Sequence, residues 1–296
     1  MPLPRSLTLP TSLPSDSRRR AGVLGHPVSH SLSPGLHRAA YRALGLVDWS
    51  YDATDVDALE LVAHVAGLDA TWVGLSLTMP LKEVAFDVAS AVSPLARATG
   101  AINTLVRRSD GWHGDNTDVH GLVVALQEAG VEQLTDLLVV GSGATARSAV
   151  AAGSRLGATR VTFMVRGAAR PETVAQAREA GLEVAQTPLG RWPEVVEVVV
   201  GTIPPTATST WADTLPEGGR ALLDVVYGDG ATPLVLAAGR AGYAVVPGTE
   251  MLIHQGAEQV RLMTGHEPPV DAMRAALAAE LDSSVSDSSV SDSSSR

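Results

Sequence analysis

A regular alternation of short apolar runs with alanine-rich stretches is the feature that most constrains how this chain can fold. In the second half, the apolar run at 137–140 enters a glycine turn at 141–143, which leads into an alanine-rich stretch ending near residue 158. Short β-branched runs that alternate with longer helical patterns are typical of βαβ units, because two parallel strands need a crossover between them. We therefore predict an α/β fold built on parallel strands.

The alternation occurs in two blocks, which predicts two α/β domains with a cleft between them. The expected boundaries are 20–117 for the first domain, 118–247 for the second, and 248–281 for two helices that return to the first. The segments 1–19 and 282–296 are both rich in Ser and poor in groups that could pack, so we expect disordered tails there.

Individual strands and helices follow from the apolar runs and from helix signals. Strands are expected at 21–26, 49–55, 71–79, 137–140, 160–165, 195–204 and 221–228. Ser33 is expected to cap a helix whose first position is Pro34, since a serine oxygen can accept from the free N–H groups at a helix start and proline has no N–H to leave unpaired.

The composition excludes several classes of function. Lys and Arg total 22 against 32 Asp and Glu, so the net charge is −10 and a nucleic-acid backbone would be repelled. The absence of cysteine excludes disulfides, thiolate catalysis and cysteine-bound metals. No apolar run reaches the ~18 residues of a membrane span, and the first residues lack the apolar stretch of a secretory signal. We expect a cytoplasmic protein without membrane contact.

The glycine turn has the pattern of a dinucleotide-binding loop. Gly141, Gly143 and Ala146 fit G-x-G-x-x-G/A directly after a strand and at the start of a helix. In such loops the first glycine permits a tight turn and the second lets a pyrophosphate approach the backbone, while the helix N-terminus favours its charge. The expected cofactor-binding residues of this loop are Gly141, Ser142, Gly143, Ala144, Thr145 and Ala146.

The end of the next strand indicates which dinucleotide binds. An NAD site usually has a carboxylate there for the ribose 2′-hydroxyl, but this chain has Arg166 and Arg170 and no carboxylate at the strand end. Two guanidinium groups suit a 2′-phosphate through charge-assisted hydrogen bonds. We predict NADP as the cofactor.

Outside the nucleotide loop, four short segments carry polar side chains that could bind a substrate or take part in catalysis. Ser31 and Ser33 lie at a helix start, where an anion is favoured. The segment 78–82 ends in Lys82, the only lysine of the chain, and lysine can release a proton near neutral pH where arginine cannot. The segments 100–104 and 114–118 supply the only two asparagines, Asn103 and Asn116, and the carboxylate of Asp118.

Together these segments resemble the shikimate dehydrogenase family, whose pattern includes S-x-S, T-x-P-x-K, G-A-x-N-T and D-N-T-D in this order. The nucleotide loop 141–147 and the late segment 248–259 match as well, so the resemblance covers about residues 20 to 280. It implies an N-terminal substrate-binding catalytic domain, a Rossmann-type NADP-binding domain, and reversible NADPH-dependent reduction of 3-dehydroshikimate to shikimate in aromatic amino acid biosynthesis.

The resemblance also implies a role for each matching residue. Lys82 and Asp118 would form the catalytic pair, and Ser31 and Ser33 would hold the substrate carboxylate. The other substrate-binding residues would be Thr78, Asn103, Asp118, Tyr227 and Gln255, and Gly248 and Met251 would contact the cofactor. An ammonium at Lys82 could stabilise negative charge on the carbonyl oxygen during reduction and deliver a proton to it.

Four positions depart from the commonest pattern of that family. Ser76 stands where Asn is usual, and Val165 stands where an Asn often precedes the arginine. The segment 201–205 replaces a common N-A-T, and Glu250 replaces a glycine at a place expected near the nicotinamide.

Three alternatives stay open beside the main interpretation. A quinate/shikimate dehydrogenase tends to have Thr in place of the second serine and to use NAD, so Ser33 and the two arginines argue against it. Another is a dehydrogenase for an amino analogue of shikimate in a secondary pathway. A non-catalytic ligand-binding relative would have no reason to keep Lys82 and Asp118. No metal is expected, the partners are small molecules only, and the chain is expected to be a monomer or a homodimer.

Overall fold

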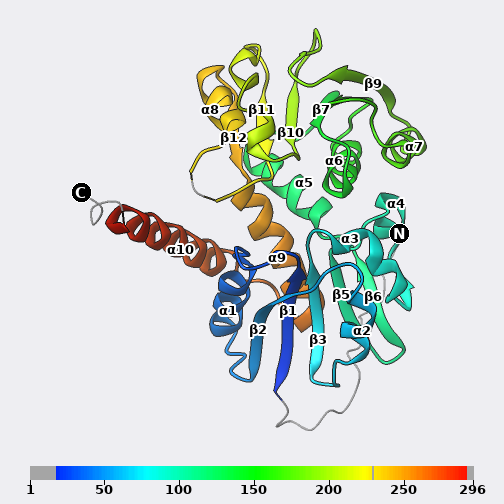
Figure 1. Cartoon of the computed structure of the whole chain (residues 1–296), viewed down its shortest axis with the longest axis vertical. Helices are drawn as coiled ribbons and strands as arrows, with labels where there is room; N and C mark the ends of the chain where they lie inside the picture. Colours follow the sequence, from blue (N-terminus) through cyan, green and yellow to red (C-terminus); the bar gives the residue numbers. More distant parts are fainter. Residues whose placement is uncertain (1–17, 229, 292–296) are drawn as a thin grey trace.

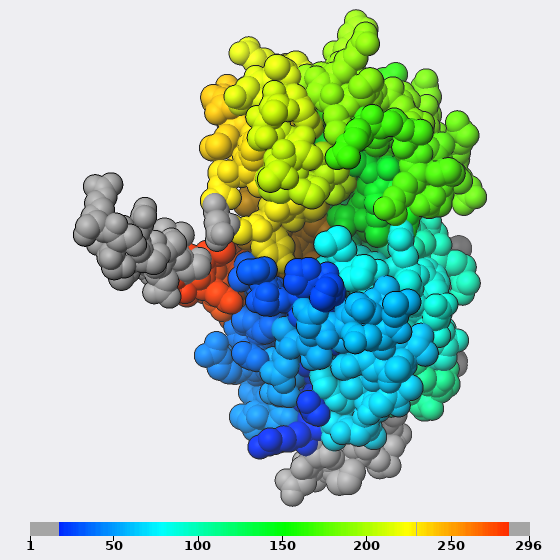
Figure 2. Space-filling model, in the orientation of Figure 1, coloured from blue at the N-terminus to red at the C-terminus, as the bar shows by residue number. Residues whose placement is uncertain are grey.

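The computed structural model describes residues 18–228 and 230–291, with side chains described as far as residue 283. The chain forms two α/β domains, each built around one six-stranded sheet (Figure 1). Figure 2 shows them as two stacked lobes, the first in blue and cyan and the second in green and yellow. This arrangement agrees with the two-domain α/β fold predicted from the alternation.

The sheet of the first domain has the order β2-β1-β3-β5-β6-β4. Its strands are β1 (Arg19–Gly25), β2 (Trp49–Asp55), β3 (Trp72–Leu77), β4 (Ala91–Val92), β5 (Thr104–Arg108) and β6 (Gly111–Asp115). β1 pairs parallel with β2 and β3, but β5 runs antiparallel to both β3 and β6. The expectation of purely parallel strands is therefore wrong for this half of the sheet. The connection from Arg108 to Gly111 is too short for a parallel crossover, so β5 and β6 form a hairpin.

The sheet of the second domain is parallel throughout, in the order β12-β11-β10-β7-β8-β9. Its strands are β7 (Asp136–Val140), β8 (Arg160–Val165), β9 (Glu183–Pro188), β10 (Val198–Gly201), β11 (Ala221–Asp224) and β12 (Ala244–Pro247). Alternate residues of β7 pack into separate cores on the two faces, Leu137 and Val139 on one and Leu138 and Val140 on the other. A strand buried on both faces explains why the run is apolar without alternation.

Helices cover both faces of both sheets (Figure 1). They are α1 (Ser33–Ala43), α2 (Leu61–Ala66), α3 (Leu81–Val84), α4 (Pro94–Thr99), α5 (Asp118–Glu128), α6 (Ala144–Arg155), α7 (Pro171–Glu179), α8 (Pro233–Arg240), α9 (Gly248–Thr264) and α10 (Val270–Ser291). Short 3-10 turns occur at Ala85–Asp87, Pro205–Ala207 and Ala212–Thr214. Within the described part of the chain, no helix is both long enough and apolar enough to cross a membrane.

Helix α9 joins the two domains. It starts directly after β12 of the second sheet, packs along α5, and ends against the first sheet. Its contact with β3 is close: a Cβ on Gly74 would lie 2.4 Å from the Sδ of Met263, so a larger residue there would displace the Met263 side chain. Side chains near the start of α9 therefore face the second domain, while those further along it face the first.

Two expectations at helix ends differ from the structure. The N-cap of α1 is Leu32, without a side-chain cap, and Ser33 is the first helical residue; the Ser33 N–H instead donates to the Oγ of Ser31 at 3.3 Å. Helix α10 continues to Ser291, into the segment 282–296 that was expected to be disordered, because Ser, Asp and Val are tolerated in a helix although none favours it strongly. Residues 1–17 of the expected tail 1–19 lie outside the described residues. Strand β1 already begins at Arg19.

Candidate active site

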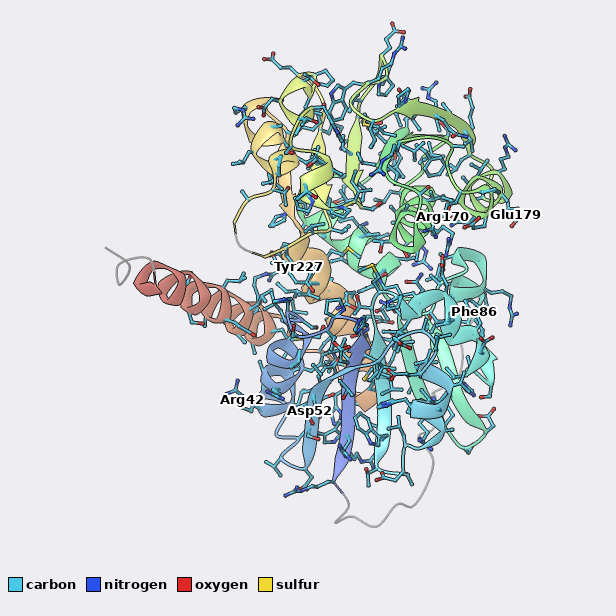
Figure 3. All side chains as sticks on the ribbon, viewed as in Figure 1. Arg42, Asp52, Phe86, Arg170, Glu179 and Tyr227 are labelled. Atoms are coloured by element: carbon cyan, nitrogen blue, oxygen red, sulfur yellow. The ribbon has the colours of Figure 1, made fainter. Side chains whose placement is uncertain are left out.

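A cavity of about 340 Å³ lies where the two domains meet, at the carboxyl ends of β1 and β3. Ligands of α/β proteins bind at this edge because the loops that follow parallel strands converge there. The expected residues that line it are Ser31, Ser33, Thr78, Lys82, Asn103, Asp118, Thr145, Tyr227, Gly248, Met251 and Gln255. Figure 3 shows Tyr227 at the level of the junction between the domains. Segments far apart in the sequence thus supply one continuous site.

Lys82 and Asp118 form an ion pair in this cavity. Lys82 follows the end of β3 on the short helix α3, and Asp118 is the first residue of α5. The Lys82 Nζ donates to Asp118 Oδ2 at 2.7 Å, and the two side chains are 16% and 5% exposed. An ammonium has three donors, so two are left for a molecule in the cavity. The poor access of water makes the charges act more strongly on such a molecule than they would at the surface.

Asn103 fixes the other oxygen of the Asp118 carboxylate. Its Nδ2 donates to Asp118 Oδ1 at 2.7 Å, and its Oδ1 accepts from the backbone N–H of Thr117 at 2.8 Å. The Thr117 N–H can only donate, so it decides which way the Asn103 amide is turned. Asn116 lies outside the cavity: its buried Nδ2 donates to Thr99 Oγ1 and to Ser148 Oγ of the second domain.

The remaining polar groups stand around this pair. Gln255, on α9, has its Oε1 3.5 Å from Asn103 Nδ2. Burial, together with the nearby charge of Asp118, raises the pKa of the Tyr227 hydroxyl, which therefore stays protonated and able to donate. Ser31 faces the cavity from the loop between β1 and α1, and Ser33 faces it from the first position of α1.

The glycine loop adjoins a second cavity of about 330 Å³. Gly141 has φ +112°, and a Cβ there would lie 2.5 Å from Thr202 Oγ1, so the first position of the motif accepts only glycine. A Cβ on Gly143 would meet nothing within 4 Å, which leaves the loop open to a ligand at the N-terminus of α6. The expected residues that line this cavity are Thr78, Lys82, Gly143, Ala144, Thr145, Ala146 and Arg170. The two cavities share Thr78, Lys82 and Thr145, so a dinucleotide on the loop can reach the lysine.

The two arginines expected at the 2′-phosphate follow β8 and are exposed. Arg170 lies at the edge of the second domain that faces the first (Figure 3), with its Nη1 3.4 Å from Glu83 Oε1. Its backbone N–H donates to Ser142 Oγ, which joins the glycine loop to the loop after β8. Arg166 makes no side-chain hydrogen bond or ion pair with the described residues. The loop, the helix N-terminus and the guanidinium groups fit NADP.

Sequence reasoning missed a buried polar cluster behind the cavity, made of Tyr51, Ser76, Thr104, Gln259 and His37. Ser76 and Gln259 also line the cavity wall. Gln259 lies one helical turn after Gln255 on α9, and residues four apart share a helix face. That spacing was the signal in the sequence that could have added Gln259 to the site.

The burial of His37 predicts that the stability of the fold depends on pH. Its ring stacks on Tyr51 at 3.9 Å, and burial lowers the pKa of His37 from 6.5 to about 3. The unfolded chain takes up a proton below about pH 6.5 while the folded chain does not until about pH 3, so the free energy of unfolding falls between these values as the pH decreases. We expect this group to contribute about 1.4 kcal/mol per pH unit.

Urea unfolding of the protein and of His37→Phe, followed at several pH values between about 7 and 4.5, measures this contribution. Other groups contribute equally to both proteins, so the difference between the two curves isolates His37. The free energy of unfolding should fall more steeply with decreasing pH in the unmodified protein. Parallel curves would contradict this assignment.

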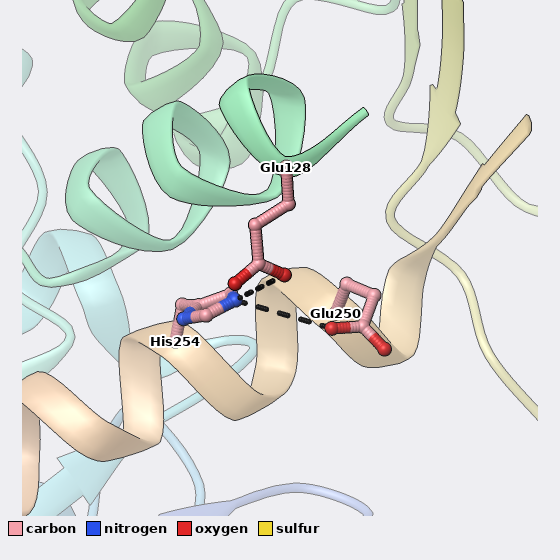
Figure 4. Close-up of side chains that lie close together, drawn as sticks. All are labelled: Glu128, Glu250 and His254. Atoms are coloured by element: carbon pink, nitrogen blue, oxygen red, sulfur yellow. Dashed lines mark ion pairs between the residues drawn. The ribbon is translucent and has the colours of Figure 1, made fainter. Parts of the chain in front are cut away.

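Glu250 does not face the cavity, contrary to its expected place near the nicotinamide. Figure 4 shows it beside Glu128 of α5 and His254 of α9. The guanidinium of Arg274, on α10, donates to the carboxylates of Glu250 at 2.9 Å and Glu128 at 3.0 Å. Glu128, Glu250 and His254 each have an oxygen or nitrogen atom that could bind a metal, and these atoms lie within 4.8 Å of one another. The sequence did not predict this cluster, because Glu128 is distant from the other two residues along the chain. Because Arg274 compensates both carboxylates, we describe this cluster as an ion-pair network that holds α5, α9 and α10 together.

The fold and the site together define a two-domain oxidoreductase that uses a nicotinamide dinucleotide. Comparison with known proteins then gives the family. The model of the shikimate dehydrogenase substrate binding domain matches residues 23–105, and that of the shikimate 5′-dehydrogenase C-terminal domain matches residues 248–278. A shikimate dehydrogenase (NADP(+)) of Rubrobacter xylanophilus is 39% identical over 272 residues, which cover 88% of this chain and 95% of that protein. The chain belongs to the shikimate dehydrogenase family.

Solved structures show the same similarity in three dimensions. The shikimate dehydrogenase of Mycobacterium tuberculosis has a TM-score of 0.82 and 41% identity, over 88% of this chain and 99% of that one. The shikimate 5-dehydrogenase of Thermus thermophilus, in complex with NADP(H) and shikimate, has a TM-score of 0.76 and 32% identity, over 88% of this chain and 98% of that one.

Proposed function

We propose that this protein catalyses the reversible, NADP-dependent interconversion of 3-dehydroshikimate and shikimate in aromatic amino acid biosynthesis. The observation that carries the proposal is the Lys82–Asp118 pair, buried at the point where the substrate-sized cavity joins the cavity of the glycine loop. A proton source, a substrate-sized cavity and a cofactor loop are then in one place.

The substrate would lie with its carboxylate against Ser31 and Ser33. Their hydroxyls and the N-terminus of α1 favour an anion there. Thr78, Asn103, Tyr227 and Gln255 would bind ring hydroxyls further along the cavity. NADP would lie on the loop 141–146, with Arg166 and Arg170 at its 2′-phosphate and with Gly248 and Met251 near its nicotinamide.

Lys82 would act on the oxygen of the reacting carbon. NADPH, when bound, supplies the hydride that reduces the ring carbonyl. Negative charge then develops on the carbonyl oxygen, and the Lys82 ammonium stabilises that charge and donates the proton that completes the hydroxyl. Asp118, held by Asn103 on one oxygen and by Lys82 on the other, keeps the ammonium in position. In the reverse direction the neutral amine of Lys82 accepts the proton of the alcohol.

Initial rates of cofactor reduction test this function directly, with shikimate and with quinate, each supplied with NADP and with NAD. We expect strong preference for shikimate with NADP. Preference for quinate or for NAD would contradict the biosynthetic assignment and favour a quinate/shikimate dehydrogenase. Activity only on an amino analogue of shikimate would assign that substrate, and binding without turnover would indicate a non-catalytic relative.

The cytoplasmic location and the monomeric or homodimeric state stay predictions from the sequence.

A further inference from the structure

We infer that Gln259 is a positioning residue for the substrate: its carboxamide turns the hydroxyl of Ser76 so that Ser76 meets the cavity as a hydrogen-bond acceptor. This inference rests on the function proposed above. Ser76 and Gln259 both line the cavity, and both are buried, with exposures of 4% and 1%.

The orientation of the Gln259 amide follows from its neighbours. Its Nε2 lies 3.0 Å from Thr104 Oγ1 and 3.4 Å from the backbone carbonyl oxygen of Asn103. A carbonyl oxygen can only accept, so the amide nitrogen must be on that side. The Oε1 is therefore directed to the opposite side, where Ser76 Oγ lies at 2.7 Å and His37 Nε2 at 3.2 Å.

This orientation determines how Ser76 uses its hydroxyl. The Ser76 O–H donates to Gln259 Oε1, and the Ser76 oxygen accepts from the hydroxyl of Tyr51 at 2.5 Å. Burial raises the pKa of Tyr51, so its hydroxyl stays protonated and donates. A hydroxyl has one donor and two acceptor positions, so Ser76 has only one acceptor position left. A substrate hydroxyl at this place must donate its proton to Ser76.

The Gln259 amide also begins a series of hydrogen bonds that leads to the Lys82–Asp118 pair. From Gln259 Nε2 the hydrogen bonds continue to Thr104 Oγ1, from Thr104 Oγ1 to Asn103 Oδ1 at 2.8 Å, and from Asn103 Nδ2 to Asp118. The backbone N–H of Thr117 also fixes the Asn103 amide, without any contribution from Gln259. The hydrogen bonds near Asp118 therefore depend less on Gln259 than the hydrogen bond of Ser76 does. Loss of the amide should therefore affect substrate binding more than turnover.

The experiment replaces Gln259 by methionine, which keeps the length of the side chain and removes its hydrogen bonds. We expect the KM for shikimate to rise about five- to tenfold, since one buried neutral hydrogen bond changes an equilibrium by about that factor. The kcat and the KM for NADP should stay within about twofold, because an interaction made equally in the ground and transition states affects KM alone.

A double-mutant cycle with Ser76→Ala tests whether Gln259 acts through Ser76. In that case the double variant should have a KM for shikimate close to that of Ser76→Ala alone. The control is Thr264→Val, a buried position on the same helix whose hydroxyl bonds only backbone groups, at Val260 O and His266 N. It should leave all three constants unchanged.

If Gln259→Met does not fold, Gln259→Leu, which also removes the amide, provides the test with the same expected rise in the KM for shikimate. A KM for shikimate that is unchanged in the folded Gln259 variant, multiplicative effects in the cycle, or an equal rise in the KM for NADP would overturn the inference. A lack of shikimate activity in the unmodified protein would contradict the proposed function instead.

Discussion

Replacement of Lys82 by alanine should lower kcat by about two to four orders of magnitude, the range typical of a lost general acid–base group. The ammonium interacts most strongly when charge develops on the carbonyl oxygen, so the loss appears in kcat and little in the KM for shikimate. Steady-state kinetics in both directions measures the effect. Lys82 is the only lysine of the chain, so no neighbouring amine can replace it.

Lys82→Arg serves as the matched control for this prediction. Arginine keeps the positive charge beside Asp118 but cannot release a proton near neutral pH. If proton transfer is the main role of Lys82, the arginine variant should be nearly as slow as the alanine variant. Turnover close to normal in Lys82→Ala would exclude the proposed mechanism, whereas turnover close to normal in Lys82→Arg alone would show that charge stabilisation is sufficient.

Replacement of Arg166 by alanine should raise the KM for NADP by about ten- to a hundredfold, since a hydrogen bond between charged groups is worth about 1.5–3 kcal/mol. The KM for NAD should change less than about twofold, because NAD has no 2′-phosphate. Arg166 suits this test better than Arg170, which also contacts Glu83. Initial rates with each cofactor, at saturating shikimate, measure the ratio.

Arg178→Ala is the control for the loss of one positive charge from the same region. Arg178 is exposed in the last turn of α7, the end of the helix remote from Arg170. It should leave the KM values for both cofactors unchanged. Equal weakening of NADP and NAD by Arg166→Ala would show that the arginine does not contact the 2′-phosphate.

Much of this site could be predicted from sequence because its parts are local. The glycine loop is a strand, a turn and a helix in one segment, and Lys82 lies a few residues after the strand that positions it. Asn103 and Asp118 are also close in sequence, and their hydrogen bond spans a hairpin. Patterns of this kind are visible in a sequence because the geometry that they require is completed within a few turns of chain.

The expectations that were wrong or incomplete concern residues whose hydrogen-bond partners are distant in the sequence. Glu250 was expected at the nicotinamide because of its place in a motif, but a helix distributes its side chains over all directions, and the carboxylate turns toward Arg274. The role of Ser76 stayed open in the sequence because its partners, Tyr51 and Gln259, come from a different strand and from a helix at the other end of the chain.

The sequence by itself determined the alternation of strands and helices, the cofactor loop and the chemical groups of the site, because each depends on residue type and short-range spacing. Only the tertiary structure decided that β5 runs antiparallel to its neighbours β3 and β6 in the first sheet, and that α9 brings Gln255 and Gln259 from the end of the chain to Asn103 and Ser76. The physical reason is that these contacts form when whole elements pack. The hydrogen bond between Ser76 and Gln259 joins residues 183 positions apart, and no local pattern in either segment specifies the other.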